Sequence, residues 1–266
     1  MKSNKIIGVL IISLLILSCS KVPITNRKQL KLLPESIMMS LSLTSYKEFL
    51  VKNPPIASSE ASAAMVKTAG KKLETAVVTF MNTKGQSKRI DNYKWEYNLV
   101  KDATVNAWCM PGGKVVVYTG LLDYTKDETG LAVVMSHEIA HAVARHGNER
   151  MSQQLAIVLG GASLSVALSQ KPEQTQNIFL TSYGVGSVLG TLAYSRLHEY
   201  EADKLGMVFM ALAGYDPSKA MDFWERMSKV STGAQLPQFL STHPSDTKRI
   251  QAIKEFLPTA MTYYKK

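Results

Sequence analysis

Two histidines and a glutamate in the run HEIAH have the spacing of a metal-binding helix. His137 and His141 are four residues apart, which on a helix places both imidazoles on one face, one turn apart. Zn²⁺ prefers such neutral imidazole nitrogens in tetrahedral geometry. Glu138 is rotated about 100° from His137. We therefore expect its carboxylate beside the metal-binding face, where it can take a proton from zinc-activated water.

The residues around this run are apolar. Residues 131–135 read LAVVM, and Ala142 and Val143 follow the run. Burying two histidines and a glutamate among such side chains is costly unless a ligand or hydrogen-bond partners compensate. We therefore predict that the helix binds one Zn²⁺ ion. A pair of hydrogen-bonded core histidines is the alternative.

A catalytic zinc site needs a third protein ligand. His146 lies five residues after His141, which rotates it about 140° away from the ligand face. The run HEYEAD at residues 198–203 offers better candidates. Glu199 and Asp203 are four residues apart and share a helix face. This spacing suits Glu199 as a ligand and Asp203 as the acceptor of a hydrogen bond from a ligand imidazole.

Other polar residues near these runs have less certain roles. His198 and Glu201 lie off the face of the proposed carboxylate ligand, so we expect them to be solvated. Arg196 lies one turn before that ligand, where it either stabilises an oxyanion or pairs with an acid; we favour the structural pairing. His243 precedes Pro244 in an expected loop. It either reaches the site, as a substrate-polarising group or a cap on the zinc in a resting state, or only marks a helix entry.

Hydrophobic periodicity predicts an α+β fold, mostly helical, with a small sheet beside the metal-binding helix; the family resemblance described below implies a zincin-like domain. The strand expected at 114–118 (KVVVY) pairs with an extended substrate if it lies at the sheet edge. Its apolar run equally suits a buried central strand. The segment 155–168 is apolar but too short to span a bilayer, so we expect a buried or membrane-touching helix. A second strand is expected at 93–100, and helices at 57–79, 127–146, 150–168, 175–207, 217–230 and 244–256.

The N-terminus resembles an export signal. Lys2 and Lys5 precede the apolar run Ile6–Leu17, and Cys19 follows it closely. A cysteine at this place is typical of lipoproteins, so we predict lipid attachment at Cys19. An ordinary secretion signal is the alternative. Cys109 is then left without a disulfide partner, and we interpret it as a small apolar residue.

The net charge is +10. The positive residues are scattered, and no nucleic-acid-binding module is recognisable, so we expect no nucleic-acid partner. Attraction to an anionic membrane surface explains the basic charge better.

Together these runs resemble the gluzincin metallopeptidases of family 48. HEIAH is followed about sixty residues later by SRLHEYEAD, as in that family. The likeness covers about residues 40–257, and without a tetratricopeptide array the chain is most similar to the short LoiP-type lipoprotein members rather than to BepA. Further matching segments are 106–113, KVVVYTGLL from residue 114, Gly206, STHP at 241–244 and KRI at 248–250.

The resemblance implies a function and a location. In this family the third metal ligand is the first glutamate of the segment, which selects Glu199 over Glu201. The family implies zinc-dependent cleavage of cell-envelope proteins, chiefly misfolded or misassembled ones. We therefore expect an enzyme anchored by lipid in the bacterial cell envelope, facing the periplasm at the outer membrane. The rival function is a non-catalytic or gated metal-bound chaperone or interaction lipoprotein.

The expected organisation has four parts. A signal peptide occupies 1–18, a tether 19–40, the metallopeptidase domain 41–257 and a C-terminal tail 258–266.

Overall fold

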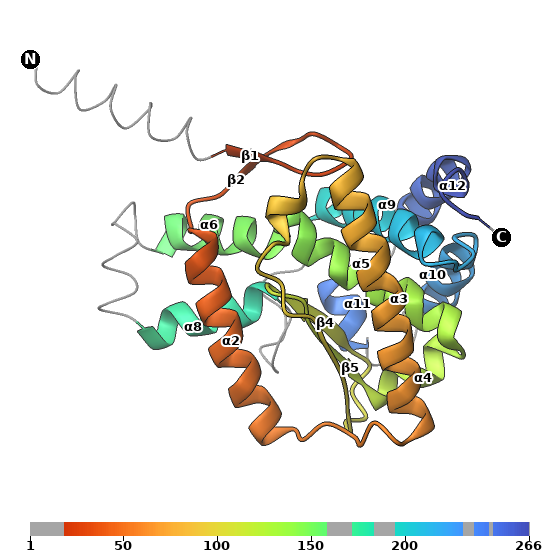
Figure 1. Cartoon of the computed structure of the whole chain (residues 1–266). Helices are drawn as coiled ribbons and strands as arrows, with labels where there is room; N and C mark the ends of the chain where they lie inside the picture. The colour runs from red at the N-terminus through yellow and green to blue at the C-terminus, as the bar shows by residue number, and fades with distance from the viewer. Residues whose placement is uncertain (1–18, 159–171, 184–194, 231–236, 245–246, 266) are drawn as a thin grey trace, which may run out of the picture.

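The described part of the chain is mostly helical, with a small three-stranded sheet and a separate two-stranded hairpin (Figure 1). The computed structural model describes residues 19–158, 172–183, 195–230, 237–244 and 247–265. This architecture confirms the predicted α+β fold with a small sheet beside the helix that carries HEIAH. The strands are β1 (Cys19–Lys21), β2 (Lys28–Leu30), β3 (Glu96–Val100), β4 (Ala107–Met110) and β5 (Lys114–Tyr118). The helices are α2 (Glu35–Lys52), α3 (Ala61–Thr83), α4 (Thr119–Thr125), α5 (Glu128–Ala144), α6 (His146–Val158), α8 (Pro172–Ser182), α9 (Arg196–Leu212), α10 (Lys219–Val230), α11 (Gln238–Thr242) and α12 (Thr247–Met261), with a short 3-10 helix at Ser87–Arg89.

β5 is the central strand of the sheet. It pairs in parallel with β3 and antiparallel with β4, in the order β3-β5-β4. The idea that β5 is an edge strand for substrate is therefore wrong. Its valines are buried on both faces, and an unbroken apolar run is typical of a strand covered on both sides.

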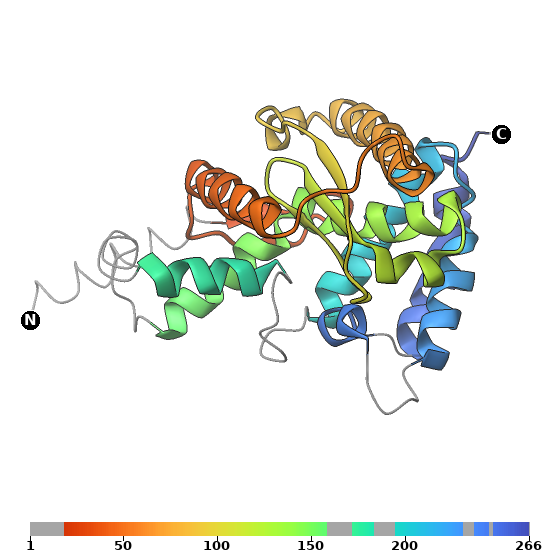
Figure 2. The same ribbon diagram turned by 90° about the horizontal axis from the view of Figure 1, so that it is seen from below.

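The two faces of the sheet contact different helices (Figure 2). Side chains alternate along a strand. Val115 and Val117 accordingly join the main core with α3, α5 and α9, whereas Val116 and Tyr118 join a smaller cluster with α2 and α8. Trp108 of β4 lies in the smaller cluster and makes an edge contact with Phe49 of α2. The sheet thus supports α5 from one side and is shielded from solvent on the other.

α5 and α9 pack closely against each other, and Gly206 permits this approach. A Cβ atom at Gly206 would lie 3.1 Å from the backbone nitrogen of His137. Each helix begins with a side-chain cap: Asp127 accepts a hydrogen bond from Gly130 at the start of α5, and Ser195 accepts one from His198 at the start of α9. Such caps fix where a helix begins, and in this register Glu199 of α9 faces His137 and His141 of α5.

Two predicted helices differ from the structure. The helix expected at 127–146 ends at Ala144, because Arg145 adopts a left-handed conformation with φ 64°, and α6 begins at His146. The single helix expected at 175–207 is wrong, since α8 ends at Ser182 and α9 begins after its Ser195 cap.

Most of the apolar segment 155–168 lies outside the described residues. Among the described helices, none has the length and hydropathy needed to span a bilayer.

The segment predicted to be a tether begins with a hairpin. β1 and β2 pair antiparallel, and Val22 is fully buried at the turn side of β1. The predicted signal peptide at 1–18 lies outside the described residues. Lipid attachment at Cys19, at the start of β1, stays a prediction.

The close contact at Gly206 yields a test of the α5–α9 packing. Gly206→Val should lower the free energy of unfolding by about 1–3 kcal/mol, because the added side chain must push backbone apart. Leu197→Val, at a site 49% exposed on the same helix, is the matched control and should change it by less than about 0.5 kcal/mol. Urea denaturation measures both. Equal losses would show that Gly206 is not the contact that limits the distance between the helices.

Candidate metal centre

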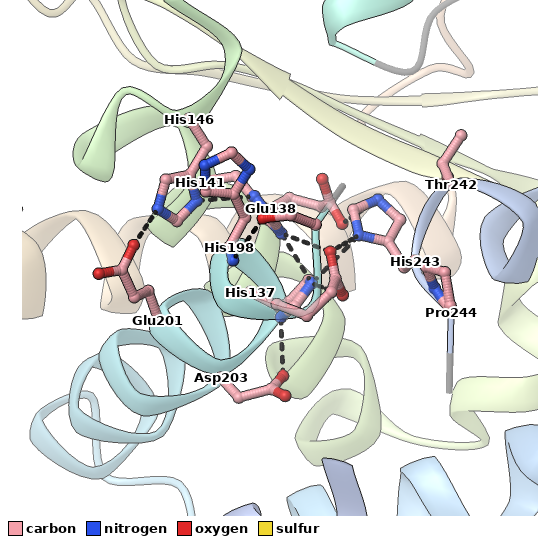
Figure 3. A network of polar contacts seen from close by, with 12 residues as sticks. His137, Glu138, His141, His146, His198, Glu201, Asp203, Thr242, His243 and Pro244 are labelled. Atoms are coloured by element: carbon pink, nitrogen blue, oxygen red, sulfur yellow. Dashed lines mark hydrogen bonds and ion pairs between the residues drawn. The ribbon is translucent and has the colours of Figure 1, made fainter. Parts of the chain in front are cut away.

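Four side chains from three elements meet at one point between α5 and α9. His137, His141, Glu199 and His243 each offer a ligand atom, and these atoms lie within 4.8 Å of one another. All four residues are buried. Figure 3 shows His137 and His141 projecting from α5 toward His243.

The separations between these atoms suit a tetrahedral zinc ion. Ligands about 2.0–2.1 Å from zinc stand about 3.3 Å apart in a tetrahedron. The Nε2 atoms of His137 and His141 are 3.0 Å apart, and each lies 3.4 Å from an oxygen of Glu199. Nδ1 of His243 is 3.2 Å from both Nε2 of His137 and Oε1 of Glu199. Three imidazole nitrogens facing one another and a carboxylate form a donor set that a cation would stabilise.

Asp203 fixes the orientation of His137. Its Oδ1 is 2.9 Å from Nδ1 of His137, so that nitrogen donates a proton and Nε2 keeps its lone pair for a ligand. Arg249 holds the same carboxylate with two hydrogen bonds of 2.7 and 2.8 Å. Without a metal ion, the carboxylates of Asp203 and Glu199 outweigh burial and raise the pKa of His137 to about 9, so a metal that binds Nε2 must displace a proton from it.

Glu199 is the carboxylate that joins the cluster, and Glu201 is not. Arg249 contacts Oε2 of Glu199 at 2.7 Å. Burial alone would raise the pKa of Glu199, but the charges of Arg249 and His243 and the hydrogen bonds of the ligand histidines lower it well below its usual value. The carboxylate is therefore ionised, as a metal ligand must be.

Glu138 lies beside the cluster, and one of its carboxylate oxygens has no hydrogen-bond partner. Its Oε1 makes no hydrogen bond and is 3.4 Å from Nε2 of His243. Burial raises its pKa above the usual value. A carboxylate with a raised pKa can both accept and release a proton near neutral pH.

His243 reaches the site from the end of the short helix α11. Its ring stacks on Phe239, with centroids 4.7 Å apart, and its backbone N–H donates to the carbonyl of Phe239. Of the roles considered from sequence, contact with the site describes its position better than a helix entry does.

Arg249, rather than Arg196, is the arginine of this centre. Arg196 is exposed at the first residue of α9, whereas Arg249 is 1% exposed and its guanidinium lies 3.4 Å from the Trp224 ring centroid. Arg249 belongs to the run KRI that resembles the family, but the sequence pattern predicted no role for it. Its position four residues before Ile253, on the same face of α12, was the available signal for a buried cation.

His198 and Glu201 are buried, so the expectation that they are solvated is wrong. Glu201 is 1% exposed and His198 is 4% exposed. The hairpin covers this side of α9, and Arg27 from it binds both Glu201 and Glu149. His146 lies outside the four-ligand group, as its rotation predicted, but its Nδ1 is 3.0 Å from Nδ1 of His141.

Comparison with known proteins assigns the chain to a family. The model of peptidase family M48 matches residues 70–257. The chain belongs to peptidase family M48. This confirms the resemblance seen in the sequence and shows that the chain carries a metallopeptidase domain; the likeness to the LoiP type stays a prediction.

The relatives of this M48 chain fall into two groups. The mitochondrial metalloendopeptidase OMA1 of Schizosaccharomyces pombe is 41% identical over 175 residues, covering 64% of this chain and 49% of the relative. OMA1 of Saccharomyces cerevisiae is 34% identical over 182 residues, covering 66% and 50%. The β-barrel assembly-enhancing protease of Escherichia coli is 29% identical over 160 residues, covering 59% and 33%. The chain thus spans about half or less of the length of these curated relatives.

These relatives contradict the predicted location. The relatives of higher identity are mitochondrial proteins, whereas the bacterial assembly-enhancing proteases are more distant. The assignment to the bacterial cell envelope is therefore wrong. It depended on a short N-terminal pattern of charged, apolar and cysteine residues and on the likeness to the lipoprotein members of the family.

The contacts of Arg249 generate a stability test. Arg249→Met would leave the carboxylates of Asp203 and Glu199 buried without their shared cation, and breaking such a pair costs about 3–5 kcal/mol. The free energy of unfolding of the metal-free protein should fall by that amount. Arg226→Met, which loses a part-buried contact to the Tyr124 carbonyl, is the control and should cost about 1 kcal/mol. A loss at Arg249 no larger than at Arg226 would contradict this assignment.

Proposed function

We propose that this chain is a zinc-dependent endopeptidase that cleaves proteins. The observation that carries the proposal is the convergence of His137, His141 and Glu199 at tetrahedral spacing, with the unbonded carboxylate oxygen of Glu138 beside them. Histidine and carboxylate ligands match the preference of zinc. A single buried carboxylate next to such a site is what hydrolysis of a peptide bond requires.

Each residue has a defined part in the proposed reaction. When bound, zinc lowers the pKa of a water molecule and polarises the scissile carbonyl. Glu138 accepts a proton from the attacking water and returns it to the leaving amine, which its raised pKa favours. Asp203 keeps Nδ1 of His137 protonated, so that Nε2 faces the ion.

The proposed substrates are polypeptides in protein quality control. Relatives named as metalloendopeptidases and as an assembly-enhancing protease support this class. An extended peptide can add to a sheet edge through main-chain hydrogen bonds. β4 lies at an edge in the described part of the sheet and packs beside α5, so β4 takes the role first considered for β5.

We further propose that His243 occupies the fourth ligand position in a resting state. A catalytic zinc keeps one position for water or substrate, whereas a closed site has four protein ligands. The proposal is supported by Nδ1 of His243, which lies 3.2 Å from Nε2 of His137 and would take that position, while its Nε2 lies 3.4 Å from Oε1 of Glu138. In this arrangement the imidazole takes the space in which water must stand to meet Glu138.

Metal content and casein cleavage test the enzymatic proposal. Purified protein should hold one zinc per chain, measured by atomic emission, and His137→Ala and His141→Ala should each lose it because three ligands are needed. Glu138→Gln should keep the zinc and lose at least about 100-fold in kcat, as loss of a general base does. Wild type that retains zinc but cleaves neither casein nor unfolded proteins would instead support the chaperone alternative.

His243→Ala tests the resting state. If His243 blocks the open position, the variant should still bind one zinc and should cleave casein several-fold faster than wild type. Thr242→Ala, a neighbour on α11 whose hydroxyl bonds only helix carbonyls among the described contacts, is the control and should cleave at the wild-type rate. Slower cleavage with zinc retained would show that the imidazole assists catalysis rather than blocking it.

A further inference from the structure

His141 has a second polar contact on the side away from the ligand cluster. Its Nε2 faces His137 and Glu199, and its Nδ1 lies 3.0 Å from Nδ1 of His146. His146 in turn places Nε2 3.1 Å from Oε2 of Glu201 (Figure 3). The three side chains therefore form a continuous chain that leads from the cluster toward the opposite side of α9.

The chemistry of metal binding fixes the direction of these hydrogen bonds. A neutral imidazole that offers the lone pair of Nε2 to a metal carries its proton on Nδ1. His141 must then donate to Nδ1 of His146, which leaves the proton of His146 on Nε2 as a donor to Glu201.

The N-terminal hairpin holds the end of this chain. Between β1 and β2, Thr25 donates to Oε1 of Glu201 at 2.6 Å, and Arg27 donates to both its oxygens at 2.9 to 3.2 Å. Arg27 also binds Glu149 through two hydrogen bonds of 2.8 Å. The hairpin thus fixes the Glu201 carboxylate with a planar, charge-assisted contact that leaves it little freedom to turn.

We propose that this hairpin is a positioning element of the metal centre. Thr25 and Arg27 orient Glu201, Glu201 orients His146, and His146 holds His141 in the tautomer and rotation that metal binding needs. None of these groups touches the metal, so Arg27, Glu201 and His146 are positioning residues. The inference rests on the proposed metal-binding function of His141. It extends the centre to residues that lie well before the family match at 70–257.

His137 and His141 are then supported in the same manner from opposite sides. Asp203 accepts a hydrogen bond from Nδ1 of His137 and is held by Arg249. His146 accepts a hydrogen bond from Nδ1 of His141 and donates one to Glu201, which is held by Arg27. Contacts that orient a ligand imidazole change metal affinity by about 10–100-fold when they are lost.

Two glutamates bound to the same arginine provide a matched comparison. Glu149 and Glu201 are both buried and both bind Arg27, but Glu149 contacts His198 rather than His146. Glu201→Gln should raise the zinc dissociation constant at least 10-fold, measured by competition with a chelator. Glu149→Gln should leave the constant within twofold of wild type, although both variants lose part of the ion pair. Equal constants in the two variants would overturn the proposal.

The part played by the hairpin has its own test. Arg27→Ala should raise the zinc dissociation constant of the wild type. In the Glu201→Gln background it should raise that constant by less than twofold more, because both changes interrupt the same series of hydrogen bonds. If Arg27→Ala does not fold, Thr25→Val replaces it and should raise the dissociation constant about threefold. Additive effects in the double variant would exclude action through Glu201.

Imidazole NMR gives a readout that does not depend on affinity. In the zinc-bound protein the ¹⁵N shifts should show His146 protonated at Nε2 and unprotonated at Nδ1. The opposite tautomer would overturn the proposed direction of the chain. Wild type that binds no zinc would instead overturn the proposed function, so the two failures are distinguishable.

Discussion

The contact between α5 and α9 removes several ionisable groups from water, and their need for partners determines much of the surrounding structure. Burying an unpaired carboxylate or imidazolium costs several kcal/mol. Gly206 allows the helices to approach so closely that His137, His141, Glu199 and Asp203 are nearly free of solvent. Such an arrangement is stable only if cations and hydrogen-bond donors arrive from outside the two helices. A metal ion can supply one of these charges, and arginines supply the others.

The two arginines that meet this need come from distant parts of the chain. Arg249 approaches from α12 and binds Asp203 and Glu199, while Arg27 approaches from the hairpin and binds Glu201 and Glu149. Each is planar and charged at all accessible pH values, so each can hold two carboxylate oxygens in fixed geometry. The α5–α9 pair is thereby stabilised from two sides. The β1–β2 hairpin and α12 both contribute to the centre, although the metal-binding run HEIAH lies in neither.

Local spacing explains what the sequence could predict. A separation of four residues places His137 with His141, and Glu199 with Asp203, on shared helix faces. In the structure His137, His141 and Glu199 face one point, and Asp203 contacts His137 from behind, at Nδ1. Rotation also placed Glu201 off that face, which is its observed position. The inference that it is solvated failed because the opposite face of α9 is covered by the hairpin, and no periodic pattern reveals such a long-range contact. Arg27 and Arg249 were missed for the same reason. The break between α8 and α9 was missed because helical periodicity continued across it.

The position of His243 suggests how readily the centre opens. Its backbone is fixed, because Phe239 accepts its N–H and Arg249 donates to the carbonyls of His243 and Pro244. The ring itself is held by stacking on Phe239 and by contacts with His137, Glu199 and Glu138. Rotation of the side chain alone would leave the backbone contacts intact. It would lose the stacking, which is worth about 0.5–1.5 kcal/mol for an aromatic pair, the contacts with the three side chains and, with zinc bound, the proposed bond from Nδ1. In the proposed reaction, a substrate that binds along β4 would offer its carbonyl oxygen to the same position and replace that bond. The proposed closed arrangement would then protect the centre until a correctly placed polypeptide displaces the imidazole.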